Sequence, residues 1–217
     1  MKKTMLIAAT ATLMGVASGS FAQDGLVVGF DDTTSGSTIA WIRNAGAWEP
    51  LFTYDSLVAD VWGLATDPNT CTLYVVSGTV LYKMNPGGPL TQVATVTLDG
   101  ATVSPVGLAW HNGQLIATRN VTDEGFYSID VTTGVATRVW TQTVGGFPTA
   151  WDFGGIDADG GTLYGITDTS PTGSIRGLYS IDLETQTLTP IVATPIFPGN
   201  PGTTPDVDGL AVGARKA

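Results

Sequence analysis

The sequence predicts an all-β fold built from four repeated antiparallel sheets, on three observations. Of the 217 residues, 28 are Gly, 12 are Pro and only 13% are charged, which is typical of strands and turns rather than helices. A glycine-anchored apolar segment recurs four times along the chain. Alternating runs and Asx-containing turns follow the first three copies. The length fits one domain with a sizeable core.

The four anchored segments are VWGLATD, PVGLAWH, FGGIDAD and VDGLAVG. Their anchors lie 44, 48 and 54 residues apart and are Gly63, Gly107, Gly155 and Gly209, with Gly154 as an alternative in the third copy. A second apolar run follows the first three segments: LYVVS, LIATR and LYGIT. Each of these is followed in turn by a third strand, so the repeat continues beyond the anchor.

An aromatic residue precedes an Asx residue by three positions in four places. These pairs are Trp41 and Asn44, Tyr82 and Asn85, Tyr127 and Asp130, and Tyr179 and Asp182. Because an Asx side chain bonds the backbone two residues further on, each pair predicts a hairpin turn and requires no ligand. Each unit is therefore a four-stranded meander of about 45 residues, which is the period of a β-propeller blade.

The two ends of the chain predict how such a ring closes. The first unit lacks a Gly-Leu-Ala strand, and the last unit, GLAVGA, is only that strand. Pairing them would remove both free sheet edges and give four blades in a closed ring. Two chains forming one eight-bladed ring are the alternative. The predicted domain is 23–217, with blades 24–56 plus 206–214, 60–99, 104–145 and 151–195.

Residues 1–22 are predicted to be a secretory signal peptide. Lys2 and Lys3 precede an apolar run that extends to about Val16, and Ser20 and Ala22 provide small residues before the cut. Export to the periplasm or the extracellular space follows. Cleavage leaves 7 basic and 19 acidic residues, so the net charge changes from −10 to 7 − 19 = −12. Such acidity argues against nucleic-acid and anionic-membrane partners.

The strings FYSIDVTTG and LYSIDLETQ, together with the Gly-Leu-Ala and LY strands, resemble the repeats of bacterial secreted β-propellers. Their relatives include the NHL, YWTD and lactonase-type repeats, and the resemblance covers essentially the whole mature chain. Members usually have five to eight blades, so four is a departure that hemopexin-like domains share. The resemblance implies that the first strand of each blade lines a central channel, and that ligands bind in a funnel at its mouth.

Acidic residues recur three positions before the anchors. Asp60, Asp152 and Asp206 occupy this column, with Ser104 in the remaining copy. Converging carboxylates would provide oxygen ligands for a hard cation, and calcium is the possible cofactor. Capping of a turn by each Asp is the structural alternative. An anchor at Gly154 would replace Asp152 by its neighbour in this column.

Three further residues are candidates for ligand binding at the funnel. Trp62 and Asp208 come one position before their anchors, and Trp151 lies at the start of its strand. The two indole rings are candidates to stack on a sugar or peptide, although packing between blades is the commoner role of such residues.

Other catalytic constellations are not supported. His111 is the only His, its HNG sequence predicts a turn, and no G-x-S-x-G elbow occurs. Cys71 is the only Cys, expected as a small buried residue in a strand. One His and one Cys cannot build a zinc site.

The sequence therefore predicts a secreted, non-catalytic propeller that binds a protein or glycan at its funnel face. A calcium-assisted lactonase-like hydrolase or lyase, using Asp60, Asp152, Asp206 and Asp208, is the alternative. A structural envelope or matrix protein is a third. A monomer is expected for a closed four-bladed ring, and a dimer for the eight-bladed one.

Overall fold

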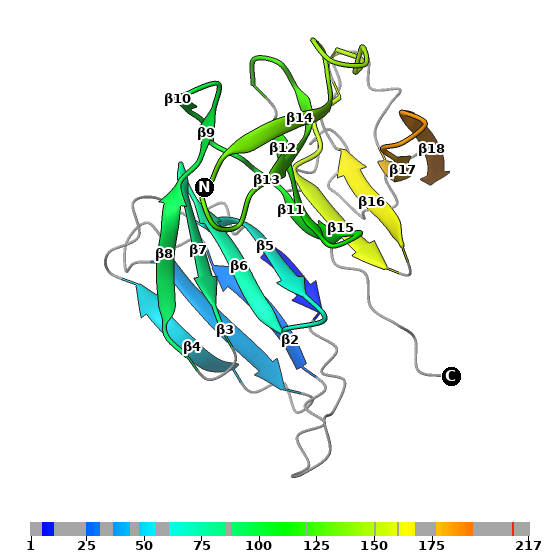
Figure 1. The fold of residues 1–217 in the computed structure, drawn as a ribbon. Coiled ribbons are helices and arrows are strands. Elements are labelled where there is room, and N and C mark those ends of the chain that lie inside the picture. Colours follow the sequence, from blue (N-terminus) through cyan, green and yellow to red (C-terminus); the bar gives the residue numbers. More distant parts are fainter. Residues whose placement is uncertain are drawn as a thin grey trace, which may run out of the picture.

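The chain folds into β-strands joined by turns, as the computed structural model shows (Figure 1). It describes residues 6–10, 25–30, 37–43, 48–54, 61–85, 88–119, 121–149, 151–159, 161–167, 177–192 and 210. For the first four ranges and for Val192, only the backbone is described. These described residues contain no helix, which confirms the predicted all-β class. Accordingly, none of them belongs to a helix long and apolar enough to span a membrane.

Four antiparallel sheets of four strands each follow one another along the chain. The first sheet contains β1 (Leu6–Thr10), β2 (Gly25–Phe30), β3 (Ser37–Arg43) and β4 (Trp48–Tyr54). The second contains β5 (Val61–Asp67), β6 (Thr72–Ser77), β7 (Val80–Met84) and β8 (Leu90–Thr95). The third contains β11 (Leu108–His111), β12 (Gln114–Arg119), β13 (Gly125–Ile129) and β14 (Ala136–Thr141). The fourth contains β15 (Gly155–Asp159), β16 (Thr162–Thr167), β17 (Gly177–Asp182) and β18 (Thr187–Val192).

The first strands of the sheets lie side by side in chain order: β1 contacts β5, β5 contacts β11, and β11 contacts β15 (Figure 1). The sheets extend outward from this row, which is a β-propeller-like arrangement. A two-stranded ribbon, β9 (Thr97–Leu98) and β10 (Ala101–Thr102), separates the second and third sheets in the chain. Closure of the ring by residues 206–214 stays a prediction, as do the predicted blade boundaries.

The anchor glycines occupy equivalent positions in three sheets. Gly63 pairs with Val76, and Gly155 pairs with Ile166, across the first two strands of their sheets. Gly107 stands in the same register, because the amide of Thr118 donates to its carbonyl at 3.0 Å. The register therefore selects Gly155, and not Gly154, as the third anchor.

Close approach between neighbouring first strands explains the glycine column. A Cβ added at Gly63 would lie 2.7 Å from the carbonyl oxygen of Val106, and one at Gly107 would lie 2.9 Å from that of Gly154. In both cases the oxygen belongs to the residue just before the next anchor. Contacts this short are too close for a side-chain carbon, so the inner strands can approach only where the side chain is absent.

Two equivalent hydrophobic cores fill the junctions between sheets. The second and third sheets bury one cluster, which includes Val76, Leu81, Leu108 and Tyr127. The third and fourth sheets bury the other, which includes Phe126, Phe153, Ile156, Leu163 and Tyr179. Such face-to-face burial replaces the disulfides that this chain lacks as a source of stability.

A register shift recurs between the third and fourth strands of every sheet. It falls at Leu81/Tyr82, Phe126/Tyr127 and Leu178/Tyr179, so the three tyrosines of the aromatic column are equivalent, and all three are buried. In the first sheet the shift comes one residue earlier than expected, at Ile39/Ala40. Ala40, and not Trp41, is therefore the residue equivalent to the three tyrosines. An extra residue in one strand changes which positions of two sheets are equivalent.

The predicted Asx turns are confirmed at Asp130 and Asp182. Asp130 Oδ1 accepts hydrogen bonds from the amides of Thr132 and Thr133, both at 2.8 Å. Asp182 Oδ1 does the same for the two residues at the corresponding positions, both at 2.9 Å. Asn85 differs, since its Oδ1 accepts from the hydroxyl of Thr72 at 3.2 Å. Asn44 lies outside the described residues.

Cys71 was expected in a strand, and this prediction is wrong. The residue lies in the turn before β6, half-buried and with φ 54°. The Asp67 carboxylate organises this turn, because it accepts hydrogen bonds from the amide of Asn69 at 2.9 Å and from the hydroxyl of Thr70 at 2.7 Å. The strand therefore begins only at Thr72.

The first sheet contains a strand that the sequence did not predict. β1 (Leu6–Thr10) pairs antiparallel with β2, although it belongs to the segment expected to be a cleaved leader. Residues 206–214 were predicted at this place beside β2. Apart from Leu210, which lies outside any strand, they are not among the described residues. Both segments are apolar and rich in small residues, so either matches the composition of an inner strand.

Candidate functional site

Three of the six predicted site residues are described, and all three lie where the chain enters a first strand. Trp62 belongs to β5, while Trp151 and Asp152 precede β15. Asp60, Asp206 and Asp208 lie outside the described residues. The register that selects Gly155 keeps Asp152 three positions before its anchor, in the column of Asp60 and Ser104.

The two tryptophans contact the cores with at least part of their rings. Trp62 stands at a register shift between Val61 and Gly63, is half-buried, and packs against the core between the second and third sheets. The Trp151 ring is also half-buried, with its centroid 4.9 Å from that of Tyr179 in an edge-on arrangement. Packing between sheets is thus one role of both residues, and ligand stacking stays a prediction.

A metal centre has limited support in the described part of the chain. No group of three His, Cys, Asp or Glu side chains that could hold an ion occurs there. Asp152, which is half-buried, is the described member of the predicted acid column. A calcium site where the chain enters the inner strands therefore depends on the three carboxylates at positions 60, 206 and 208.

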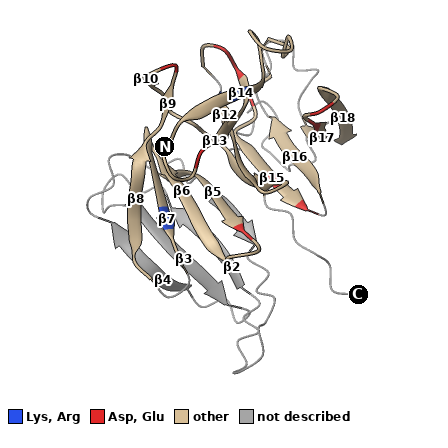
Figure 2. Ribbon diagram, in the orientation of Figure 1, with Lys and Arg blue, Asp and Glu red and all other residues tan. Residues whose placement is uncertain are grey.

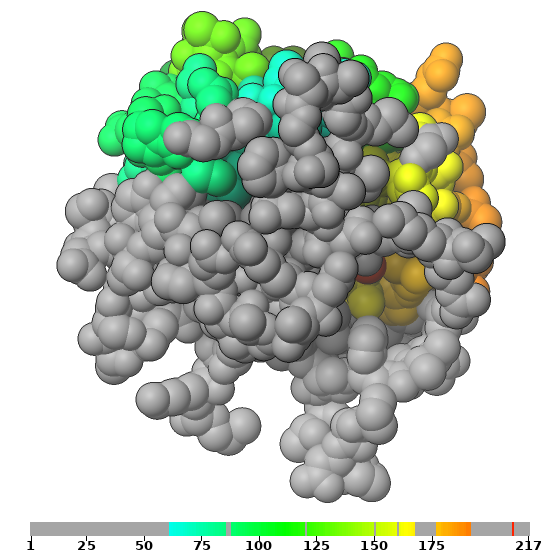
Figure 3. All heavy atoms as spheres, turned by 90° about the horizontal axis from the view of Figure 1, so that it is seen from below, coloured from blue at the N-terminus to red at the C-terminus, as the bar shows by residue number. Residues whose placement is uncertain are grey.

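A cavity of about 540 Å³ opens between the third and fourth sheets, at the opposite end of the inner strands. We call it the His111 groove. Both turns that follow an inner strand, β11–β12 and β15–β16, contribute to it. Its lining consists of His111, Asn112, Gln114, Ile116, Val139, Gly161, Thr162, Ser180, Ile181, Asp182, Leu183, Glu184 and Thr189. Figure 3 shows the fourth sheet, in yellow and orange, along one side of the molecule.

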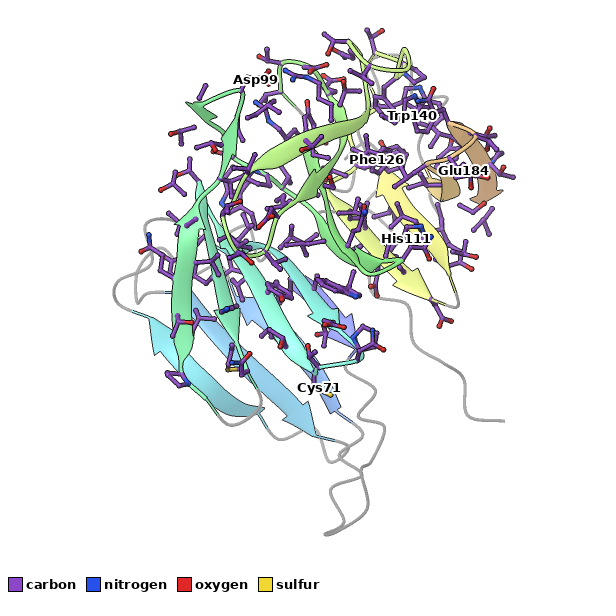
Figure 4. All side chains as sticks on the ribbon, viewed as in Figure 1. Cys71, Asp99, His111, Phe126, Trp140 and Glu184 are labelled. Atoms are coloured by element: carbon purple, nitrogen blue, oxygen red, sulfur yellow. The ribbon has the colours of Figure 1, made fainter. Side chains whose placement is uncertain are left out.

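His111 and Glu184 reach this groove from different sheets (Figure 4). The imidazole Nε2 of His111 lies 3.1 Å from Asn112 Nδ2, and its buried Nδ1 has no hydrogen-bond partner among the described residues. Burial lowers the pKa of His111, and the nearby Asp182 carboxylate offsets this only in part. The ring is therefore neutral at pH 7, and when Asn112 Nδ2 donates to Nε2 the ring proton lies on the buried Nδ1.

His111 and Asp152, the described acid of the predicted column, lie far apart. His111 follows Gly107 by four residues, whereas Asp152 precedes Gly155 by three, and the two strands run side by side in the same direction. A rise of about 3.3 Å per residue separates them by roughly 20 Å along the strands. These two groups consequently cannot act together on one substrate atom.

A second cavity, of about 410 Å³, lies on the third sheet. We call it the Trp110 groove. Its lining consists of Trp110, Gly113, Gln114, Leu115, Ser128, Ile129, Asp130, Val131, Thr132, Thr133, Val135 and Thr137. The turn between β13 and β14 contributes to this groove as the turn between β17 and β18 contributes to the His111 groove.

Acidic residues gather at strand ends and turns, as Figure 2 shows at the ends of β5 and β15 and between β17 and β18. Asp182 and Glu184 bring two of these charges to the His111 groove. Backbone hydrogen bonds from Thr185, and to a lesser extent from Glu184, lower the pKa of Asp182. The groove is therefore negatively charged at neutral pH.

One polar cluster was not foreseen from the sequence, where the arginines are scattered. Arg138 Nε lies 2.6 Å from Asp123 Oδ2, and its Nη1 lies 2.6 Å from Asp99 Oδ2. The amide and hydroxyl of Thr143 also donate to the Asp123 carboxylate, each at 2.9 Å. Burial raises the pKa of Asp123, but the hydrogen bonds from Arg138 and Thr143 outweigh it and leave the pKa well below its usual range.

This cluster connects three segments, one from the β9–β10 ribbon and two from the third sheet. Asp99 lies in the β9–β10 turn, Asp123 precedes β13, and Arg138 belongs to β14. Separations of 39 and 15 residues make the partners invisible to local sequence patterns. Its hydrogen bonds are satisfied internally, so the cluster holds loops together and does not form an open anion site.

No family model matches this sequence, and no curated protein matches it significantly. Solved structures match in fold. Xyloglucan PUL GH43B of Bacteroides ovatus is 13% identical with a TM-score of 0.53, covering 90% of this chain and 44% of its own. A catalytically inactive virginiamycin B lyase of Staphylococcus aureus, solved with quinupristin, is 15% identical with a TM-score of 0.48. The match covers 78% of this chain and 53% of the lyase chain. This chain thus spans about half the length of these structures, and the first similarity concerns the β-propeller-like fold alone.

Proposed function

We propose that this chain is an exported, non-catalytic binding protein that presents a protein or glycan ligand site on its propeller-like fold. The separation of His111 from Asp152, at opposite ends of the inner strands, carries the proposal. A hydrolase that used the one imidazole beside the acid column would need both groups at one substrate atom. A negatively charged surface favours neutral or cationic ligands.

The experiment combines binding with recovery of the ligand. The mature chain, beginning at Gln23, is screened against glycans and short peptides, and each bound ligand is recovered and weighed by mass spectrometry. We expect saturable binding and recovery of the ligand unchanged after long incubation. Conversion of a bound ligand at a rate proportional to protein concentration would overturn the non-catalytic proposal.

A calcium-assisted lactonase-like hydrolase or lyase is the second candidate. The register observation favours it, because Asp152 keeps its place in the column with Asp60 and Asp206, next to Asp208. Carboxylate oxygens in such a ring would hold calcium, which would polarise a carbonyl oxygen. On this alternative, calcium raises the melting temperature and Asp152→Ala removes the effect, since a cation bound only to the native state stabilises it. Absence of bound metal and of any chelator effect would exclude it.

Ring closure by the C-terminal strand is also proposed, together with membership of the NHL, YWTD and lactonase-type repeats. The support is a contact that recurs between neighbouring sheets. Val106, just before the anchor Gly107, approaches Gly63, and Gly154, just before the anchor Gly155, approaches Gly107. Continued once more, the same pattern would bring Asp208 close to Gly155. Removal of residues 1–22 would leave the place beside β2 to residues 206–214.

Truncation tests this closure. A mature chain ending at Pro205 is expected to melt at least about 10 °C lower than the chain ending at Ala217, because both sheet edges become free. Size-exclusion chromatography should show the longer chain as a monomer. Equal melting temperatures, or an obligate dimer, would contradict a closed four-bladed ring.

A further inference from the structure

The His111 groove and the Trp110 groove are lined by the same positions of the repeat. Ser128, Ile129 and Asp130 line one, and Ser180, Ile181 and Asp182 line the other. The strings YSID that contain them fix this equivalence. The two grooves are therefore copies of one feature, repeated at successive positions of the fold.

The copies differ in what fills the neighbouring junction. At the second-to-third junction, the rings of Tyr74 and Trp110 stack with centroids 5.4 Å apart and an interplanar angle of 3°. At the third-to-fourth junction, the registers place Ile116 where Tyr74 stands and Ala158 where Trp110 stands. Both of these smaller residues pack in the core between the third and fourth sheets.

The stacked rings thus have no counterpart beside the His111 groove. This groove is the larger of the two, at about 540 Å³ against about 410 Å³, and Ile116 forms part of its lining. The larger groove thus lies at the junction that has the smaller side chains at these two positions. A flat ring from outside can therefore pack beside Ile116 in this groove, whereas Ala158 packs in the core and is not part of the lining.

We propose that the His111 groove binds the aromatic side chain of a cationic peptide. This inference rests on the proposed binding function and names its ligand class. The apolar floor is formed by Ile116, Val139, Ile181 and Leu183, and the ring of a Trp or Tyr packs on it.

Charge selects the flanking residues of the ligand. The carboxylates of Asp182 and Glu184 line the groove, and His111 is its only basic side chain among the described lining residues, neutral at pH 7. A Lys or Arg next to the aromatic residue is attracted to this pair. The Nδ1 of this imidazole is buried, so His111 adds neither a positive charge nor an exposed Nδ1–H to the groove.

A peptide fits this surface better than a sugar. Sugar sites commonly provide an aromatic platform on which the pyranose ring stacks, whereas no Phe, Tyr or Trp occurs among the described lining residues. The groove has no aromatic side chain among its described lining residues, and the aromatic side chain comes from the peptide.

The test uses the peptide Lys-Trp-Lys, blocked at both ends, with Lys-Ala-Lys as the matched control and cellohexaose as the glycan probe. Binding to the mature chain is measured by isothermal titration calorimetry at low and high salt. We expect Lys-Trp-Lys to bind at least tenfold more tightly than Lys-Ala-Lys, and to weaken several-fold at high salt. Cellohexaose is expected to bind more weakly than Lys-Trp-Lys.

Filling the groove with the chain's own pair is the decisive variant. Ile116→Tyr combined with Ala158→Trp copies the Tyr74–Trp110 stack and is expected to weaken Lys-Trp-Lys binding at least tenfold. Ile116→Phe alone serves if the double variant does not fold, as judged by its thermal melt. Val135→Thr, an exposed change on the neighbouring groove, is the control and should bind as the parent does.

The outcomes separate the two proposals. Equal affinity for Lys-Trp-Lys and Lys-Ala-Lys, or undiminished binding by the filled variants, overturns the aromatic-peptide inference. Binding of cellohexaose but not of Lys-Trp-Lys overturns the inference and leaves the broader binding function standing. Chemical conversion of Lys-Trp-Lys overturns the non-catalytic function, while loss of affinity in the filled variant still supports the site.

Discussion

The carbonyl oxygen of Val106 lies 2.7 Å from the point where a Cβ on Gly63 would stand. The equivalent approach recurs between the third and fourth sheets, where the carbonyl oxygen of Gly154 lies 2.9 Å from the point where a Cβ on Gly107 would stand. The glycine column is thus a contact between neighbouring sheets, and not a property of turns within one sheet. It sets how closely the inner strands approach and so holds the β-propeller-like arrangement together.

Gly63→Ala is expected to destabilise the protein by about 1–3 kcal/mol, because the new methyl group meets backbone that cannot move aside. Urea unfolding followed by circular dichroism measures this. Gly88→Ala is the matched control, since a Cβ there would lie 3.4 Å from the Asn85 carbonyl oxygen, an ordinary contact. Equal stability of the two variants would show that the inner strands can move apart.

Thr118→Val should also destabilise the protein, by about 1–3 kcal/mol, because it removes two buried hydrogen bonds without changing side-chain shape. The Thr118 hydroxyl accepts from the amide of Gly107 at 2.9 Å and donates to the carbonyl of Phe153 at 2.7 Å, and the residue is 2% exposed. Thr137→Val, on an exposed position of β14, should change stability by no more than about 0.5 kcal/mol. A similar small effect at Thr118 would mean that water replaces the lost partners.

Asp123→Asn is expected to cost about 1–3 kcal/mol, whereas Asp99→Asn should cost less than about 1 kcal/mol. Both carboxylates bind Arg138, but the Asp123 side chain is 10% exposed and that of Asp99 is 72% exposed. Denaturant unfolding at pH 7 compares the two variants. A larger loss for Asp99→Asn would show that the β9–β10 ribbon, and not the buried carboxylate, is the essential partner.

The same pair of variants has a pH signature. The folded pKa of Asp123 lies below its unfolded value near 4, so its stabilisation is full above that value and is lost as the pH falls through the folded pKa. Acid unfolding of Asp123→Asn should therefore be shallower than that of the parent chain. Parallel acid curves for the two proteins would contradict the lowered pKa.

His111 should make stability fall on mild acidification. Its folded pKa lies below the unfolded value of about 6.5, so the unfolded chain binds the proton more readily. The contribution is complete above pH 7 and declines as the pH falls from 6.5 towards the folded pKa. The free energy of unfolding, measured in urea at pH 8 and pH 5, should drop less in His111→Gln than in the parent. Equal drops would mean that Asp182 fully offsets the effect of burial.

Local patterns were the part of this fold that could be predicted. The turns at Asp130 and Asp182 form through hydrogen bonds to residues two and three positions on, so their geometry is contained in a few consecutive residues. The spacing of anchors and tyrosines could also be predicted, because it is a periodicity of the sequence itself. Cys71 shows the limit of this reasoning, because the hydrogen bonds that Asn69 and Thr70 donate to Asp67 extend the turn where β-propensity predicted a strand.

The candidate sites depended on longer contacts. Arg138 meets partners 15 and 39 residues away, and the His111 groove joins β12, β14 and the β17–β18 turn. His111 had been predicted only as a turn residue, and a comparison of aligned repeats would have shown the missing Tyr74–Trp110 pair beside it. The residues around Tyr74 and those around Trp110 do not by themselves predict that the two rings stack.

The sequence by itself determined the repeat, the all-β class, the hairpin turns and the acidic surface, because each is contained in the periodicity of the sequence, in a few consecutive residues or in the composition. The tertiary structure decided which residues share a junction. It separated His111 from Asp152, paired Arg138 with two distant carboxylates, and left one of two equivalent grooves without an aromatic pair. The physical reason is that packing between sheets depends on the combined shapes of two faces, which no single repeat contains.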